Sequence, residues 1–190
     1  MEGSNVYNVT AKILRKINQT KDTSSTRALF ANIRNSINKS SSNNLDALAF
    51  VFNNMPEEYI GFGKELSDYE QAILYALHQQ SNEKSVLKIE YNEGEKRQNL
   101  GDALSTLRGS DNKSIDRRFN AMILSSNYLQ LQNHLRQFIK LLKAKSDAKV
   151  DYASVADDLF WFLKNQKDGV KIKWSRSYYK FRKVNDKGEN

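Results

Sequence analysis

Apolar residues recur at three- and four-residue spacing along most of the chain, which is the period of an α-helix with one buried face. The clearest example spans residues 127–144. Five apolar residues there share one face: Leu131, Leu135, Phe138, Ile139 and Leu142. Arg136, Lys140 and Lys143 are displaced from this face by about half a turn. The pattern predicts an amphipathic helix with a solvent-facing row of three cations.

Similar spacing predicts further helices on both sides of this one. The expected ranges are 6–17, 26–38, 45–54, 68–80, 100–107, 114–126, 127–144, 152–163 and 170–183, with a short helical turn from Pro56 to Tyr59. Within 45–54 the expected inward residues are Leu45, Leu48, Ala49 and Phe52. The fold class is therefore all-α, with eight to nine helices in two small helical bundles.

Residues with short polar side chains stand where several of these helices should begin. Asn44, Asn127 and Asp151 are expected N-caps, and Ser67 with Glu70 has the spacing of a capping box. The segment 81–98 is polar and charged, although its residues 86–91 (VLKIEY) alternate like a short strand that lacks a partner. We therefore predict an N-terminal bundle at 1–98, with a polar linker at 81–98, and a C-terminal bundle at 99–190.

Charge is distributed unevenly along the 190 residues, whose formal net charge is +8. Residues 1–44, 108–145 and 171–190 carry +5, +6 and +5, while residues 45–107 and 146–170 carry −6 and −2. Such an excess favours an anionic partner, with nucleic acid ahead of a membrane surface. A soluble surface without a special partner usually mixes positive and negative side chains. Residues 108–145 differ, because they contain eight basic and only two acidic residues.

No group of residues has the spacing of a catalytic or metal site. His78 and His134 are isolated, and the neighbouring acids Asp157 and Asp158 point about 100° apart on a helix. We read these two acids as one charge partner for a basic residue and one solvated acid. We expect no enzyme activity, no cofactor and no metal. The chain has no cysteine, no apolar run near the roughly 20 residues of a membrane span and no N-terminal signal core, so a cytoplasmic protein without a membrane partner is expected.

Three expected helices combine an apolar stripe with a basic stripe, an arrangement that suits a phosphate backbone without base recognition. Two other functions fit the same pattern. One is a helical adaptor for an acidic protein. The other is a DNA-binding regulator that uses residues 114–126 and 127–144 as a helix-turn-helix, although the second helix has few base-reading side chains near its start.

An ordered set of segments resembles a known family. The segments are 76–80 (ALHQQ), 100–104 (LGDAL), 114–120 (SIDRRFN), 134–143 (HLRQFIKLLK) and 150–159 (VDYASVADDL), followed by Trp174 and Tyr178-Tyr179. In this order, over roughly residues 10–182, they resemble the small subunit (CasB) of the type I-E CRISPR surveillance complex, Cascade. The resemblance rests on the order of the whole set of segments.

The resemblance implies a non-catalytic, all-helical protein that is present in two copies in the complex. It would contact the other Cascade subunits, the CRISPR RNA and the target DNA, and would stabilise the guide–target duplex and the displaced strand of the R-loop in antiviral defence. A separate helicase-nuclease would cut the target. The alternative is a basic helical adaptor or DNA-binding regulator outside CRISPR systems.

The candidate nucleic-acid-binding residues come from two sources. The resemblance indicates Arg27, Arg117, Arg118 and Arg136. The basic stripes add Arg34, Arg108, Lys113, Lys140, Lys143, Arg176 and Lys180. Arg118 lies at the edge of an apolar stripe, so it is expected either to contact phosphate or to pair with a carboxylate.

Overall fold

The computed structural model describes residues 6–20, 23–36, 45–81, 97–109 and 112–180, and the side chains of residues 34–36 and 45 lie outside this description. The described helices are α1 (Val6–Gln19), α2 (Ser24–Ser36), α3 (Leu45–Phe52), η2 (Glu57–Tyr59), α4 (Asp68–Ser81), α5 (Leu100–Ser105), α6 (Lys113–Ile123), α7 (Tyr128–Lys145), α8 (Tyr152–Leu163) and α9 (Lys167–Tyr178). The all-α class is confirmed.

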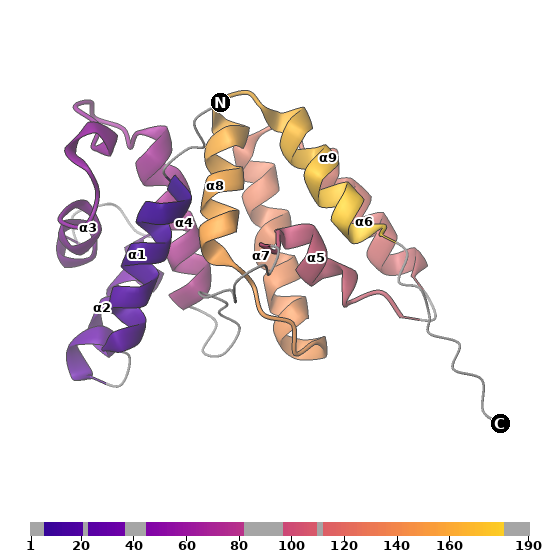
Figure 1. The fold of residues 1–190 in the computed structure, drawn as a ribbon, viewed down its shortest axis with the longest axis horizontal. Coiled ribbons are helices and arrows are strands. Elements are labelled where there is room, and N and C mark those ends of the chain that lie inside the picture. Colours follow the sequence, from indigo (N-terminus) through magenta and orange to yellow (C-terminus); the bar gives the residue numbers. More distant parts are fainter. Residues whose placement is uncertain (1–5, 21–22, 37–44, 82–96, 110–111, 181–190) are drawn as a thin grey trace.

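Helix α8 lies at the centre of the molecule and packs against α1 and α4 on one side and α9 on the other (Figure 1). Helices α2 and α3 extend the α1–α4 side, while α5 packs against α9 and α6 against α7. Helix α8 has this position because it is apolar around most of its girth, with Tyr152, Val155, Leu159 and Phe162 all buried. The division into 1–98 and 99–190 stays a prediction, and residues 82–96 of the linker, which include 86–91, lie outside the described residues.

The expected helix starts agree with the structure where it describes them. The Ser67 amide donates to Glu70 Oε2 at 2.6 Å and the Glu70 amide donates to Ser67 Oγ at 3.2 Å, which is a reciprocal capping box. Asn127 and Asp151 accept from the backbone amides of Gln130 and Ser154. The expected cap at residue 44 lies outside the described residues.

Two predictions about helix faces and ends were wrong. Helix α3 buries Ala47 and Val51, whereas Ala49 is exposed and Leu48 and Phe52 are only half-buried. A short helix made almost entirely of apolar residues has no polar face to mark its orientation. Helix α9 begins at Lys167, three residues before the expected start, because Asn165 adopts the left-handed φ of 61° that lets the chain reverse directly after α8.

A buried carboxylate connects α8 to α9. Asp158, only 2% exposed, accepts hydrogen bonds from Lys173 Nζ and Trp174 Nε1, both at 2.7 Å. Burial raises the pKa of Asp158, and the Lys173 charge and both hydrogen bonds oppose that rise. Of the neighbouring acids Asp157 and Asp158, one was expected to pair with a basic residue, and that acid is Asp158. The other acid of the pair, Asp157, is half-buried, so the prediction of one solvated acid was wrong.

The closest approach between α5 and α9 depends on a glycine. A Cβ atom added at Gly101 would lie 2.1 Å from the backbone oxygen of Trp174 and 2.9 Å from its carbonyl carbon. Both atoms belong to the backbone, so no side-chain rotation could relieve the overlap. The glycine of the LGDAL segment is thus required by helix packing.

We predict that Gly101→Ala destabilises the protein by about 1–3 kcal/mol or more, because α9 must move away from α5. The matched control is Gly169→Ala in α9, where an added Cβ would meet nothing within 4 Å. This control should be neutral or stabilising by up to about 1 kcal/mol. Urea unfolding followed by circular dichroism measures both changes, and equal stabilities would contradict the packing argument.

Candidate nucleic-acid interface

The SIDRRF segment opens α6 and presents two different faces. Phe119 is fully buried and Asp116 is half-buried, whereas Arg117 and Arg118 are exposed. Successive helical residues point about 100° apart, so one short segment can hold the helix in place and still present two cations.

The inward face of this segment forms an ion pair and a hydrogen bond with two other parts of the chain. Arg108, which follows α5, donates from Nε to Asp116 Oδ1 at 3.1 Å and from Nη2 to Oδ2 at 3.3 Å. The Tyr178 hydroxyl, at the end of α9, donates to Asp116 Oδ1 at 2.7 Å. Burial is the largest cause that raises the pKa of Tyr178, followed by its bond to Asp116. Asp116 thus joins α6 to α9 and to the end of α5.

Aromatic rings complete this junction. The ring of Phe119 stacks on that of Tyr178, with centroids 3.7 Å apart and planes 6° from parallel. Tyr179 is edge-on to both rings, and its hydroxyl lies 2.8 Å from Asn120 Oδ1. The Arg108 guanidinium lies 5.3 and 5.2 Å from the centroids of Tyr178 and Tyr179. Arg108 is therefore a half-buried, paired side chain, unlike the exposed cation that the basic stripe predicted.

Most of the other candidate cations are exposed. They are Lys113, Arg117 and Arg118 of α6, Lys140 and Lys143 of α7, Arg176 of α9 and Lys180 just after it. Within the described part of the chain Arg117, Arg118 and Lys140 make no ion pair. Arg118 is exposed and has no carboxylate partner among these residues, whereas the alternative expected it to be partly buried against a carboxylate.

Arg136 differs from this exposed group. It is half-buried, and its Nε atom is shielded from solvent without a hydrogen-bond partner in the described part of the chain. It lies on the side of α7 that faces α4, where the Tyr75 hydroxyl donates to the carbonyl of Gln132 at 2.6 Å. The predicted solvent-facing row of three is therefore wrong at Arg136. The reason is that this residue stands at the border between the buried and exposed arcs of α7.

The helices that carry the exposed cations are neighbours. Helix α6 packs along α7, and Arg118 shares a small recess with His134 and Gln137 of α7. The end of α9 rests on α6 through Tyr178 and Tyr179. Residues 113–145 contain seven Lys or Arg and one acid, Asp116, which is already paired. We call the exposed cations of these helices the α6–α7–α9 surface. It consists of Lys113, Arg117, Arg118, Lys140, Lys143, Arg176 and, directly after α9, Lys180. This surface is strongly positive.

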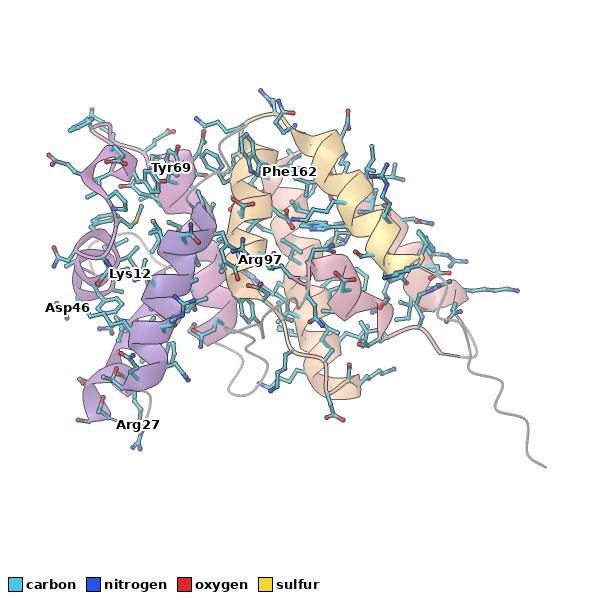
Figure 2. The ribbon with its side chains drawn as sticks, in the orientation of Figure 1. Lys12, Arg27, Asp46, Tyr69, Arg97 and Phe162 are labelled. Carbon is cyan, nitrogen blue, oxygen red and sulfur yellow. The ribbon has the colours of Figure 1, made fainter. Side chains whose placement is uncertain are left out.

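The N-terminal candidates lie elsewhere. Arg27 is exposed on α2, in the group of helices on the other side of α8 from α6 and α9 (Figure 2). The side chain of Arg34 is outside the described residues. Both positions are on α2, so they do not belong to the α6–α7–α9 surface.

Within the described residues no three His, Cys, Asp or Glu side chains come together as a metal site. His78 is buried, with Nδ1 3.2 Å from Gln79 Nε2, and His134 is half-buried against α6. None of the described helices has the length and apolar character to span a membrane.

We predict that Asp116→Ala destabilises the protein by about 2 kcal/mol, because it leaves the Tyr178 hydroxyl and the Arg108 guanidinium without their shared acceptor. Asp147→Ala, at an exposed loop carboxylate, is the control and should stay within about 0.5 kcal/mol of the parent protein. Thermal and urea unfolding measure both. If the two variants lost the same stability, the cluster would not hold α6 against α9.

Comparison with known proteins identifies the family. The fold is similar to the crystal structures of CasB from Thermobifida fusca (21% identity, TM-score 0.67, 91% of this chain and 97% of that chain) and CasB from M. ruber (21% identity, TM-score 0.67, 90% and 92%). It is also similar to CasB from Thermus thermophilus (20% identity, TM-score 0.62, 90% and 97%). A search of curated protein sequences finds no significant match.

The model of the family described as CRISPR-associated protein Cse2 matches residues 29–179, which is most of the chain. This match confirms the family that the ordered sequence segments indicated. The chain belongs to the Cse2 family of CRISPR-associated proteins.

Proposed function

We propose that this protein is the non-catalytic small subunit of a type I-E Cascade complex and that its α6–α7–α9 surface binds nucleic-acid backbone. The observation that carries the proposal is the charge of this surface. Seven bases stand against one acid over residues 113–145, and that acid is occupied by Arg108 and Tyr178. Arg117, Arg118 and Lys140, three exposed cations of this segment, consequently have no ion-pair partner among the described residues.

The binding follows from simple electrostatics. Cations on rigid helices release counterions when they contact phosphates, which gives affinity without reading base identity. In an RNA-guided complex base pairing reads the sequence, so a protein subunit need only hold the strands. Such a surface would steady the guide RNA–target DNA duplex and the displaced strand of the R-loop.

The candidate residues have different roles in this proposal. Arg117, Arg118 and Lys140 are the main phosphate contacts, because they are exposed and make no ion pair in the described chain. Four further exposed cations extend the surface: Lys113, Lys143, Arg176 and Lys180. Arg108 holds α6 and α9 in position through Asp116. Arg136 lies at the border of the surface. Arg27 and Arg34, both on α2, would be a second, separate group of nucleic-acid contacts.

The partners in this proposal are the CRISPR RNA, the target DNA, the other Cascade subunits and a second copy of the chain, in the cytoplasm and without a cofactor. The alternative was an adaptor or DNA-binding regulator outside CRISPR systems. Membership of a CRISPR-associated family argues against it.

We predict that the purified protein binds single- and double-stranded nucleic acid regardless of sequence, with affinity that falls steeply as salt rises. The triple variant Arg117→Gln, Arg118→Gln, Lys140→Gln should reduce the slope of log K against log salt by about 2–3 on duplex DNA, at about 0.9 for each phosphate that the protein no longer neutralises. Fluorescence anisotropy over a salt series measures the slope. The variant should melt like the parent protein, because none of the three side chains is buried.

The matched control removes the same charge from another part of the chain. Lys12, Arg15 and Lys64 are exposed and lie on α1 and on the loop before α4. Their replacement by Gln should leave the slope within about one unit of the parent value. Equal reductions in both triple variants would mean that net charge, and not the α6–α7–α9 surface, determines binding. Salt-independent binding by the parent protein would contradict the proposal altogether.

A further inference from the structure

Tyr179 is a large aromatic side chain that remains 37% exposed at the end of α9. Its neighbour Tyr178 is fully buried. The two residues differ because Tyr178 stacks flat on Phe119, whereas the ring of Tyr179 stands nearly perpendicular to both, at 89° and 86°. Burial of Tyr178 explains how the chain is held together, but it does not explain why a second tyrosine stays at the surface.

The Tyr179 ring is held in one orientation. Its hydroxyl bonds to Asn120 Oδ1 at 2.8 Å, and its body touches Phe119 and Tyr178. The Arg108 guanidinium, itself fixed by two bonds to Asp116, lies 5.2 Å from the ring centroid. A ring that is already ordered loses little rotamer entropy when a ligand packs against it.

Three exposed cations stand at sequence positions close to Tyr179 or to its hydrogen-bond partner Asn120. Arg176 precedes Tyr179 by three residues, which places the two side chains on neighbouring positions of the helix surface, and Lys180 follows it directly. On α6, Arg117 precedes Asn120 by three residues, and Asn120 is the residue to which the Tyr179 hydroxyl bonds. An exposed, fixed aromatic ring among phosphate-binding cations is the arrangement by which proteins hold unpaired nucleotides.

We propose that Tyr179 is a stacking platform for an unpaired nucleobase, so that the junction of α6 and α9 holds single-stranded nucleic acid. This inference rests on the proposed function, because the cations that would hold the phosphates are those of the α6–α7–α9 surface. Every base offers a π face, so the contact would not select a sequence. It would select a strand whose bases are free, since the bases of a duplex are stacked within it.

The test compares base-bearing and abasic single strands of equal length and charge, with the full-length protein. Fluorescence anisotropy is used at one salt concentration, with thymine-only DNA, its uracil-only RNA counterpart and an abasic DNA. The parent protein should bind the strands with bases about fivefold to a hundredfold more tightly than the abasic strand, which is the range for loss of one stacked base. The DNA and RNA arms distinguish the two sources of a single strand.

Two substitutions separate stacking from structure. Tyr179→Leu keeps an apolar side chain but removes the π face, so it should abolish the preference for bases and leave abasic binding unchanged. Tyr179→Phe keeps the ring and loses only the bond to Asn120, so it should retain the preference. Thermal melting of both variants verifies folding. Tyr179→Trp, which keeps an aromatic face, should retain the preference for bases that Tyr179→Leu loses, and this supplies a second readout.

The outcomes are distinct. A preference for bases that disappears in Tyr179→Leu supports the inference, and its appearance with DNA alone or RNA alone identifies the strand. A parent protein that binds both kinds of strand equally, or a Tyr179→Leu variant that keeps the preference, overturns the inference while the salt-dependent backbone binding of the proposed function stands. Absence of salt-dependent binding in the parent protein overturns both.

Discussion

Asp116 is the acceptor on which the C-terminal half of the structure depends. Its carboxylate takes two bonds from Arg108 and one from Tyr178, so a single side chain joins α6 to the end of α5 and to α9. A half-buried acid of this kind is favourable only while its partners are present, because an unpaired donor or acceptor away from water is costly. The same contact also takes Arg108 out of the set of exposed cations.

The ion pairs of Asp116 and Asp158 separate the paired cations of the C-terminal helices from the exposed ones. Arg108 lies inside the junction with its charge paired, and Lys173 is paired with the buried Asp158. Arg117 and Arg118, next to Asp116 in sequence, point outward without a carboxylate partner in the described chain. Two of the acids are thus paired inside the fold, and the exposed Arg117, Arg118 and Lys140 keep their charge without an ion pair among the described residues. The net charge of the sequence does not reveal this division.

The sequence predicted best where a pattern is local. The three- and four-residue spacing of apolar residues along α7 identified its buried side chains. Short polar side chains marked the starts of α4, α7 and α8. It predicted poorly where tertiary contacts decide. Nothing local shows that Arg108 meets Asp116 or that Tyr178 meets a residue 62 positions away, and Arg136 was misplaced because periodicity does not show where α4 covers α7. The sequence does contain a signal for Tyr179, because this aromatic residue follows Arg176 by three positions in a basic segment. Helical spacing alone did not single this residue out.

Lysine acetylation footprinting of the nucleic-acid-bound protein tests the central claim most directly. Mass spectrometry compares the reactivity of each exposed lysine with and without a bound oligonucleotide, so every site is its own control. We predict that Lys113, Lys140, Lys143 and Lys180 on the α6–α7–α9 surface lose reactivity on binding, while Lys12 and Lys64 keep theirs. Protection of Lys12 and Lys64 with unchanged reactivity on α6, α7 and α9 would contradict the account.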